Sequence, residues 1–592
     1  MSDQQGKSEQ ARQLLADAQA KGTGATLRAF VKLSGPGWLQ SAITLGGGSL
    51  AGALFLGILG GTSLLWVQFL AIVMGVVMLS AISYVTLSTG QRPFNAINQH
   101  VNPALGWGWL VATAMANMIW CMPQFSLCFE ALETNLAPGM VSGVTESFAS
   151  EGNDGSTSAK LLISLVILIA TSIIVTLNRK QGVSAKVFDV ILKALVGMIV
   201  LCFFGVVVYL TIDGQLQWGS ILSGFIPDLS AFSGPTGKVA ELMPQMSADA
   251  QEFWTSKVVT SQRAIMIGAI ATAVGINMTF LMPYAMLHRG WDKTFRGLAR
   301  FDLGTGMAIP YVLVTTCVVI AAQQAFHATA EPEFLGTDAK AFAESATFGG
   351  AKDNLLARVQ PEANAKYADY VKDMSEDEKL ALWKKMAALP EAEKRVASSL
   401  VKRKSFALSK ALAPLIGDKT AQYVFGLGVF GMGFSTIIIL MLINGFVFCE
   451  AMGKPDKGGP FVMGCLIAGI AGAAWPLIWD GPAKMWLAIL TSSFGMMLLP
   501  IAYITFFLMM NSHSLMGKEK PTGTKMLVWN VLMAISTVGA TGAAGVALFD
   551  KITKGKNATG TVVLCVLIVY LILVAAGFMM RKKAPPVASS EA

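Results

Sequence analysis

Charged side chains are scarce in this sequence. Asp, Glu, Lys and Arg make up 14% of its 592 residues, whereas 54% of the residues are hydrophobic. Soluble globular domains carry about 25% charged residues, so this composition excludes an ordinary water-soluble protein. The apolar residues gather in blocks of about 20, the length that an α-helix needs to cross a bilayer. The sequence therefore predicts an all-α integral membrane protein whose surroundings are the lipid bilayer.

Several kinds of functional motif are also missing. The chain has no Gly-x-x-x-x-Gly-Lys phosphate loop and no His/Cys cluster, and its seven cysteines follow no zinc or disulfide spacing. The first 30 residues contain no apolar core behind basic residues, so no cleaved signal peptide is expected. The net charge is +9, but the basic residues are scattered over short loops. This distribution argues against nucleic acid as a partner. We expect neither an enzyme nor an ATP-driven pump, and no cofactor.

About twelve apolar stretches are predicted to cross the membrane. They cover residues 38–60, 63–88, 106–133, 160–177, 188–211, 264–287, 303–325, 422–449, 460–480, 485–510, 526–548 and 560–580. Basic residues in short loops mark the cytoplasmic side. With the N-terminus inside, the inner loops hold Arg92, Arg179, Lys180, Lys186, Arg289, Lys293, Arg296, Arg300, Lys454, Lys457, Lys518, Lys520 and Lys525, and the tail holds Arg581, Lys582 and Lys583. We therefore expect a multi-pass protein of the inner (cell) membrane with both termini in the cytoplasm.

One charged segment interrupts the pattern. The predicted division is a cytoplasmic segment 1–30, spans one to seven in 31–325, a helical extracytoplasmic insertion 326–415, spans eight to twelve in 416–581, and a cytoplasmic tail 582–592. Within the insertion, Ser375 and Glu378 are spaced as a capping box, and Pro390 can end one helix and begin another. The insertion is either a cap that binds a protein partner or gates access, or a decoration packed on the outer rim.

Two spans are predicted to be broken near the middle of the bilayer. The first contains Thr44-Leu45-Gly46-Gly47-Gly48-Ser49, and each glycine costs a helix interior about 1 kcal/mol relative to alanine. The sixth contains Gly275-Ile276-Asn277-Met278-Thr279, followed by Pro283. Close helix packing through the glycines and a structural hydrogen bond from Asn277 are the alternatives. Broken helices at this depth are tolerated where they line a cavity, and spans five apart correspond in two inverted five-helix repeats.

The pattern therefore predicts a transporter with its site between the two breaks. Candidate substrate-binding residues are those that offer backbone groups or hydrogen-bonding side chains at the breaks and in the tenth span: Thr44, Gly46, Gly47, Gly48, Ser49, Thr272, Gly275, Asn277, Thr279 and Ser492.

Several short motifs resemble one known family. They are Gly35-Pro36-Gly37, then Ala51, Leu54, Gly57 and Ser63-Leu64-Leu65-Trp66, and later Leu412-Ala413-Pro414-Leu415-Ile416-Gly417, Phe425-Gly426, Gly433-Phe434-Ser435, Glu450, Leu499-Pro500 and Leu515-Met516-Gly517. In these the chain resembles the Nramp metal-ion transporters. The resemblance implies a LeuT-like fold of inverted five-helix repeats with extra helices, and a divalent metal cation as the transported solute. It does not extend over residues 326–410.

The family's ligands are not matched residue by residue. Gly46-Gly47-Gly48-Ser49 stands where the family has Asp-Pro-Gly-Asn, Gly275 stands at its metal-binding Met, and Asn277 at its His. Ser492 takes the place of a Gln. The resemblance implies acidic residues of a proton route in the third span. At those positions this chain has Thr113, Trp120 and Pro123, which are not acidic.

Three functions remain open on these residues. A secondary or facilitated transporter could move a divalent cation by alternating access, for example hydrated Mg²⁺ on neutral oxygens. The backbone N–H groups of Gly46 to Gly48 and a half-helix N-terminus would instead suit an amino acid or carboxylate. A transporter-derived receptor or scaffold is the third. Intramembrane acids that could relay protons are few, and Glu130, Glu133, Asp189 and Asp302 suit interfacial anchors or ion pairs better, so uncoupled movement is allowed.

Overall fold

The structure is a computed structural model, and all of its regular elements are helices. It describes residues 2–150, 154–178, 197, 201, 204–205, 207–363, 365–403, 417–456, 458–479, 484, 486–554 and 559–580. Several predicted features lie outside these residues: most of span 188–211, the tail 582–592, Cys202, Asp189, Arg179, Lys180, Lys186, Lys457, Arg581, Lys582, Lys583 and the motif Leu412 to Ile416.

Nine apolar helical stretches among the described residues are long enough to cross a membrane. The predicted first and second spans run together in one of them, and the predicted ninth span forms the shorter helix α25. The membrane helices are α3 (Pro36–Thr44), α4 (Gly47–Gly60), α5 (Leu65–Thr89), α7 (Pro103–Ala131), α9 (Ser156–Asn178), α13 (Ala248–Ala273), α14 (Ile276–His288), α15 (Arg296–Leu303), α16 (Ile309–Phe326), α24 (Asp418–Ala451), α25 (Gly459–Ala473), α26 (Trp486–Asn511), α28 (Gly523–Lys554) and α29 (Thr559–Met579). The multi-span, all-α architecture is as predicted.

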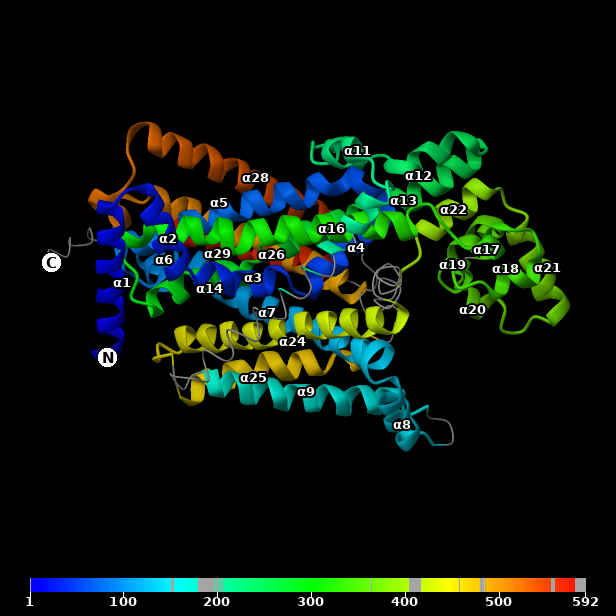
Figure 1. The fold of residues 1–592 in the computed structure, drawn as a ribbon, viewed down its shortest axis with the longest axis horizontal. Helices are drawn as coiled ribbons and strands as arrows, with labels where there is room; N and C mark the ends of the chain where they lie inside the picture. The colour runs from blue at the N-terminus through cyan, green and yellow to red at the C-terminus, as the bar shows by residue number, and fades with distance from the viewer. Residues whose placement is uncertain are drawn as a thin grey trace.

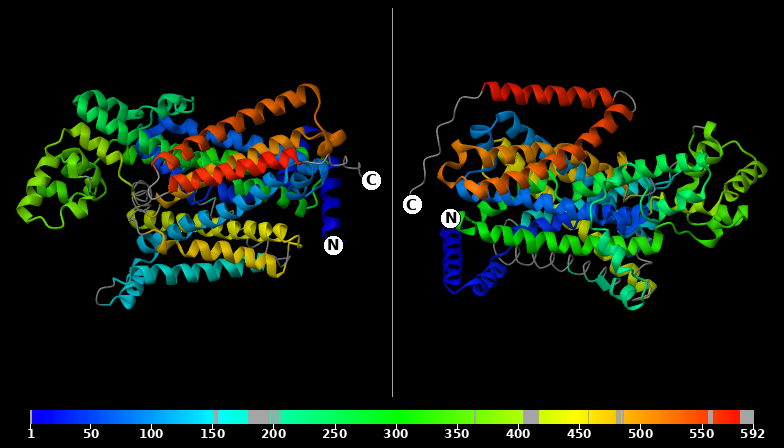
Figure 2. Two further views of the ribbon diagram at one scale, coloured as in Figure 1. Left: turned by 180° about the vertical axis from the view of Figure 1, so that it is seen from behind. Right: turned by 90° about the horizontal axis from the view of Figure 1, so that it is seen from above.

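The helices are arranged in two groups joined by α7. Helices α9, α24 and α25 lie side by side in one layer (Figure 1), and α7 packs against both α24 and α26. In the other group, α13 packs on α4, α5 and α26, and α16 packs on α4. Helix α29 runs along the outer edge (Figure 2), and none of its apolar residues is buried by the rest of the protein. A helix that is apolar all round suits direct contact with lipid.

Two ends of the molecule can be distinguished. The insertion forms α17 (Pro332–Leu335), α18 (Ala339–Glu344), α19 (Phe348–Val359), α20 (Tyr367–Tyr370), α21 (Glu376–Ala387) and α22 (Glu391–Ser399) at the insertion end (Figure 1). Helix α1 (Ser2–Ala20) crosses the opposite end, here called the terminal end. The capping box of Ser375 and Glu378 is confirmed, and Pro390 precedes α22 as its N-cap.

His327 joins the insertion to the membrane helices. Its Nε2 accepts a hydrogen bond from the Lys238 N–H at 3.0 Å, and its Nδ1 lies 3.0 Å from the Ile58 carbonyl oxygen near the C-terminus of α4. A carbonyl only accepts, so Nδ1 carries the hydrogen. The ring is 1% exposed, and burial lowers the pKa of His327 to about 4. Just beyond it, Ser399 Oγ accepts from the Ala328 N–H at 3.0 Å.

A second anchor lies deeper in the insertion. The carboxylate of Glu393 on α22 is 2% exposed. It accepts from Arg358 Nε at 2.7 Å and from the Trp254 indole N–H at 2.8 Å. Because Trp254 belongs to α13, this carboxylate ties the insertion to a membrane helix.

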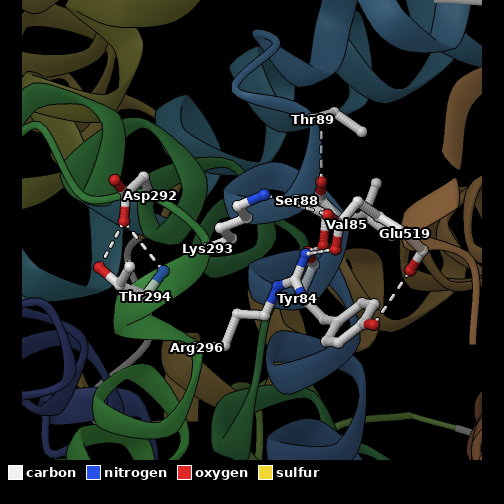
Figure 3. Close-up of polar contacts among 9 residues, drawn as sticks. All are labelled: Tyr84, Val85, Ser88, Thr89, Asp292, Lys293, Thr294, Arg296 and Glu519. Carbon is white, nitrogen blue, oxygen red and sulfur yellow. Dashed lines mark hydrogen bonds and ion pairs between the residues drawn. The ribbon is translucent and has the colours of Figure 1, made fainter. Parts of the chain in front are cut away.

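At the terminal end, ion pairs join three chain segments (Figure 3). Glu519 pairs with Arg296 at 2.6 Å and with Lys293 at 3.3 Å, and its carbonyl accepts from the Tyr84 hydroxyl at 3.0 Å. The hydrogen bond from Arg296 holds the pKa of the Glu519 carboxyl below its usual range. The Arg296 guanidinium also lies 4.4 Å from the centre of the Tyr84 ring. These contacts connect α5, α15 and the loop after α26.

Candidate functional site

The first and sixth spans are both broken, as the sequence predicts. Helix α3 ends at Thr44 and α4 begins at Gly47, while α13 ends at Ala273 and α14 begins at Ile276. Gly46 and Gly275 precede the second halves in extended conformation, and neither supplies a side-chain cap. Ser49 Oγ donates to the Thr272 carbonyl at 3.2 Å, which links the two breaks directly. Two helix N-termini and two helix C-termini therefore meet near mid-depth.

The glycine triplet is explained by close approach to three other spans. A Cβ on Gly46 would lie 2.6 Å from Thr436 Oγ1 in α24, and one on Gly47 would lie 2.1 Å from a methyl of Leu127 in α7. A Cβ on Gly48 would lie 3.0 Å from Thr272 in α13. The break itself falls at Leu45 and Gly46, and the other two glycines open α4. The triplet thus serves both the interruption and helix packing.

A cavity of about 40 Å³ lies between the two breaks. At roughly 10–15 Å³ for each water centre, it has room for about three waters. Among the residues that the structure describes, its lining includes no charged side chain. The lining residues are Ile43, Gly48, Ser49, Trp120, Pro123, Gln124, Ala271, Thr272, Gly275, Asn277, Met278, Thr436, Leu440, Ala488, Thr491 and Ser492.

The predicted candidates divide into two groups. Gly48, Ser49, Thr272, Gly275, Asn277 and Ser492 come together around the cavity. The other four lie beside it. Thr44 Oγ1 donates to the Gln40 carbonyl at 3.0 Å, and the Gly47 N–H donates to Gln124 Oε1 at 3.2 Å. Gly46 packs on Thr436. Thr279 is turned toward α7, where its Oγ1 accepts from the Trp109 indole at 3.0 Å.

Asn277 is the most informative polar side chain of the cavity. It is 0% exposed, and its Oδ1 accepts from the Met278 N–H at 2.9 Å. Its Nδ2 has no hydrogen-bond partner among the described residues. A buried donor left unpaired is costly, so this amide indicates a water or solute in the cavity.

Several lining residues were not predicted as site residues. Gln124, Thr436 and Thr491 add side-chain oxygens, and Trp120 adds an aromatic wall. Met278 brings a thioether, whose sulfur lies 3.6 Å from the Thr44 hydroxyl oxygen. Gln124 and Trp120 are one helical turn apart on α7, but no local sequence pattern shows that this face of α7 turns toward the breaks.

Aromatic side chains fill the space from the cavity toward the terminal end. The Trp109 ring lies 4.8 Å from that of Phe280, which stacks on Tyr284 at 4.4 Å. Beyond Tyr284, Arg92 NH2 pairs with Asp456 at 2.7 Å, and Arg92 also pairs with Glu450. Asp302, expected as an interfacial anchor or an ion-pair partner, is buried and accepts from the N–H groups of Gly35 and Gly37 at 3.1 and 2.7 Å.

The described residues contain no group of three or more His, Cys, Asp or Glu side chains placed to hold a metal ion. An ion in the cavity would meet only hydroxyl, amide and carbonyl oxygens, the Met278 sulfur and the Trp120 ring. Such a site can bind a hydrated cation or a polar organic solute.

Comparison with known proteins identifies the fold family. The family model described as natural resistance-associated macrophage protein-like, Nramp, matches residues 37–346 and 396–545, well over half of the chain. The structure of the Eremococcus coleocola manganese transporter, in complex with an aromatic bis-isothiourea substituted compound, has a TM-score of 0.59 and 12% identity, and covers 93% of this chain and 95% of that one.

A point variant of the same Eremococcus coleocola manganese transporter gives similar values. Its TM-score is 0.58 and its identity 13%, with 93% of this chain and 94% of that chain covered. No curated protein matches. The length of the family match shows that this multi-span membrane protein belongs to the Nramp family.

Proposed function

We propose that this Nramp protein is a secondary or facilitated transporter that moves a divalent metal cation, with Mg²⁺ carrying part of its hydration shell as the best-fitting solute. The observation that carries the proposal is the cavity between the two helix breaks, which is lined by neutral oxygens. The family match and the manganese transporter structures support a metal cation as cargo.

The chemistry of the lining favours a hydrated hard cation. Mg²⁺ prefers oxygen ligands and gives up its waters reluctantly. The hydroxyls of Ser49, Thr272 and Ser492 and the carbonyls at the ends of α3 and α13 can contact such waters, and the cavity has room for about three of them. A bare dication without a carboxylate would pay a large desolvation penalty. Thioethers suit softer metals than Mg²⁺, and the described lining contributes one thioether, that of Met278.

The lining residues also bear on whether movement of the cation is coupled to movement of protons. None of the described residues that line the cavity has a side chain that titrates near neutral pH. Binding and release of a cation here therefore require no change of protonation in the cavity wall. This supports uncoupled, facilitated movement.

A second candidate is a small organic solute with a carboxylate group. The unpaired Nδ2 of Asn277 is a donor, and the N-termini of α4 and α14 add positive potential beside it. This pattern would suit an anion. A receptor or scaffold gains nothing from two interrupted spans, and no observation favours it.

Thermal stabilisation of the purified protein in detergent tests the proposal. A ligand at 100 times its Kd stabilises the native state by about 2.7 kcal/mol, so Mg²⁺ should raise the Tm, and Asn277→Ala should lose this rise. Asn444→Ala is the matched control, because Asn444 is equally buried in α24 but donates to the Gly464 carbonyl at 2.8 Å, away from the cavity. A Tm rise with amino acids or carboxylates and none with metals would support the second candidate. No rise with any of these solutes would leave only the receptor or scaffold.

Adding a carboxylate to the cavity should change its metal preference. Ser49 is buried and lines the cavity, so Ser49→Asp at pH 8 should strengthen Mn²⁺ binding at least tenfold, about 1.4 kcal/mol, by direct charge attraction. Ser49→Asn supplies a neutral side chain of the same shape. Calorimetric titration with Mn²⁺ measures both variants, and equal affinities would place the cation site elsewhere.

A further inference from the structure

The indole of Trp120 lies between the backbones of two membrane helices. A Cβ on Gly275, at the start of α14, would lie 2.4 Å from Cη2 of this ring. A Cβ on Gly495, in the middle of α26, would lie 2.0 Å from its Cζ2. Real Cβ atoms do not approach other atoms this closely. Both helices therefore need glycine where they face the ring, and the ring reaches α14 and α26 from α7.

The ring also forms part of the cavity wall. Trp120 lines the cavity together with Gly275, Asn277 and Ser492, and among the lining residues that the structure describes it is the only aromatic one. It is neither fully buried nor fully exposed. Gly275 and Gly495 have no side chains that could fill the space of the ring if it were removed. The size of the cavity therefore depends in part on this ring.

We infer that Trp120 is a specificity-determining residue that restricts the cavity to solutes as small as a metal ion with a few waters. The inference rests on the function proposed for the same cavity. The ring occupies the space that a longer organic solute would need, and the indole N–H is the one hydrogen-bonding group of this side chain. Trp120 would then exclude larger solutes, while the neutral oxygens of the lining hold the ion.

Thiol labelling measures this exclusion without knowledge of the cargo. Ser492 lines the cavity and is buried, so a Ser492→Cys variant of the full chain reports on what reaches the cavity. Methanethiosulfonate reagents of two sizes, a small ethylammonium and a bulky biotin derivative, are applied to the protein in detergent. The parent chain with Ser492 retained corrects for labelling of the native cysteines. With Trp120 present, the small reagent should react at least tenfold faster than the bulky one.

Replacing the ring should remove that difference. In Ser492→Cys/Trp120→Ala the two reagents should react at similar rates, whereas Trp120→Phe, which keeps a ring, should retain most of the discrimination. Trp107→Ala is the matched control, because Trp107 lies on the same helix and is 47% exposed on its outer surface. An unchanged ratio in Trp120→Ala would overturn the inference. If neither reagent reacts in Ser492→Cys or in Ser492→Cys/Trp120→Ala, the inference is also overturned, because Trp120 would then not be what limits entry to the cavity.

The labelling experiment tests the role of Trp120 independently of whether the proposed function is correct. If Mg²⁺ does not stabilise the protein but labelling depends on Trp120, the cavity is size-limited and carries another small solute. If Mg²⁺ binds but labelling ignores Trp120, the cation site stands and the role of the ring is wrong.

Discussion

Acidification from pH 6.5 to pH 4 should lower the free energy of unfolding by about 3 kcal/mol through His327 alone. Burial lowers the pKa of this ring from 6.5 to about 4 in the folded protein. Above pH 6.5 the imidazole is neutral in both states and contributes no pH dependence. Between pH 6.5 and 4 the unfolded chain takes up a proton and the folded chain does not, so stability falls. Below pH 4 the loss is complete.

The contacts of His327 explain why protonation is resisted. A proton on Nε2 would face the Lys238 N–H, which now donates to that nitrogen. Thermal unfolding of the purified protein between pH 8 and pH 4 measures the effect, and His327→Gln should flatten the profile in this window. His513→Gln is the control, because His513 is exposed at the other end of the molecule. The same pH profile in His327→Gln as in the parent protein would show that another group is responsible.

Arg358→Ala should destabilise the insertion by about 3 kcal/mol, at the low end of the 3–5 kcal/mol typical of a broken buried ion pair. The variant leaves the carboxylate of Glu393 buried with the Trp254 indole as its remaining side-chain donor in the described contacts. Arg358 itself is about one-fifth exposed, so little of the interaction is screened by water. Hydrogen exchange over α19 to α22 should speed up, because this carboxylate fixes the insertion to α13.

A second substitution separates the charge from the packing. Arg358→Ala combined with Glu393→Gln should recover much of the loss, because a neutral amide is cheaper to bury without its cation. Lys379→Ala breaks an exposed pair with Glu376 and should cost less than about 1 kcal/mol. Equal exchange rates in Arg358→Ala and the parent protein would mean that the insertion is held by other contacts.

Local sequence signals predicted the parts of the fold that depend on backbone propensity. The glycine triplet and Gly275 located both helix breaks because helix formation is costly at glycine whatever surrounds it. The capping box of Ser375 and Glu378 was equally local. The apolar stretches predicted membrane-spanning helices because the thickness of the bilayer fixes the length of a helix that crosses it.

Features that depend on contacts between distant segments could not be read from the sequence. Thr279 was chosen for its depth in the sixth span, but its side chain faces Trp109, and helical depth does not specify that direction. The wedging of Trp120 between Gly275 and Gly495 requires the relative placement of α7, α14 and α26. The partners of His327 at Ile58 and Lys238 appear only when α4, α12 (Gly237–Leu242) and α16 are brought together.

The cavity-lining residues in the described part of the chain carry no formal charge, and this has an electrical consequence. A dication held there is not neutralised by the cavity wall, so under the proposed function the loaded protein moves two elementary charges across the membrane field. Each is worth about 2.3 kcal/mol per 100 mV. An inside-negative potential of 100 mV would thus favour inward movement by about 4.6 kcal/mol, which corresponds to roughly a two-thousandfold accumulation. The return of the empty cavity would be insensitive to voltage, so under the proposed function the membrane potential alone could supply the driving force.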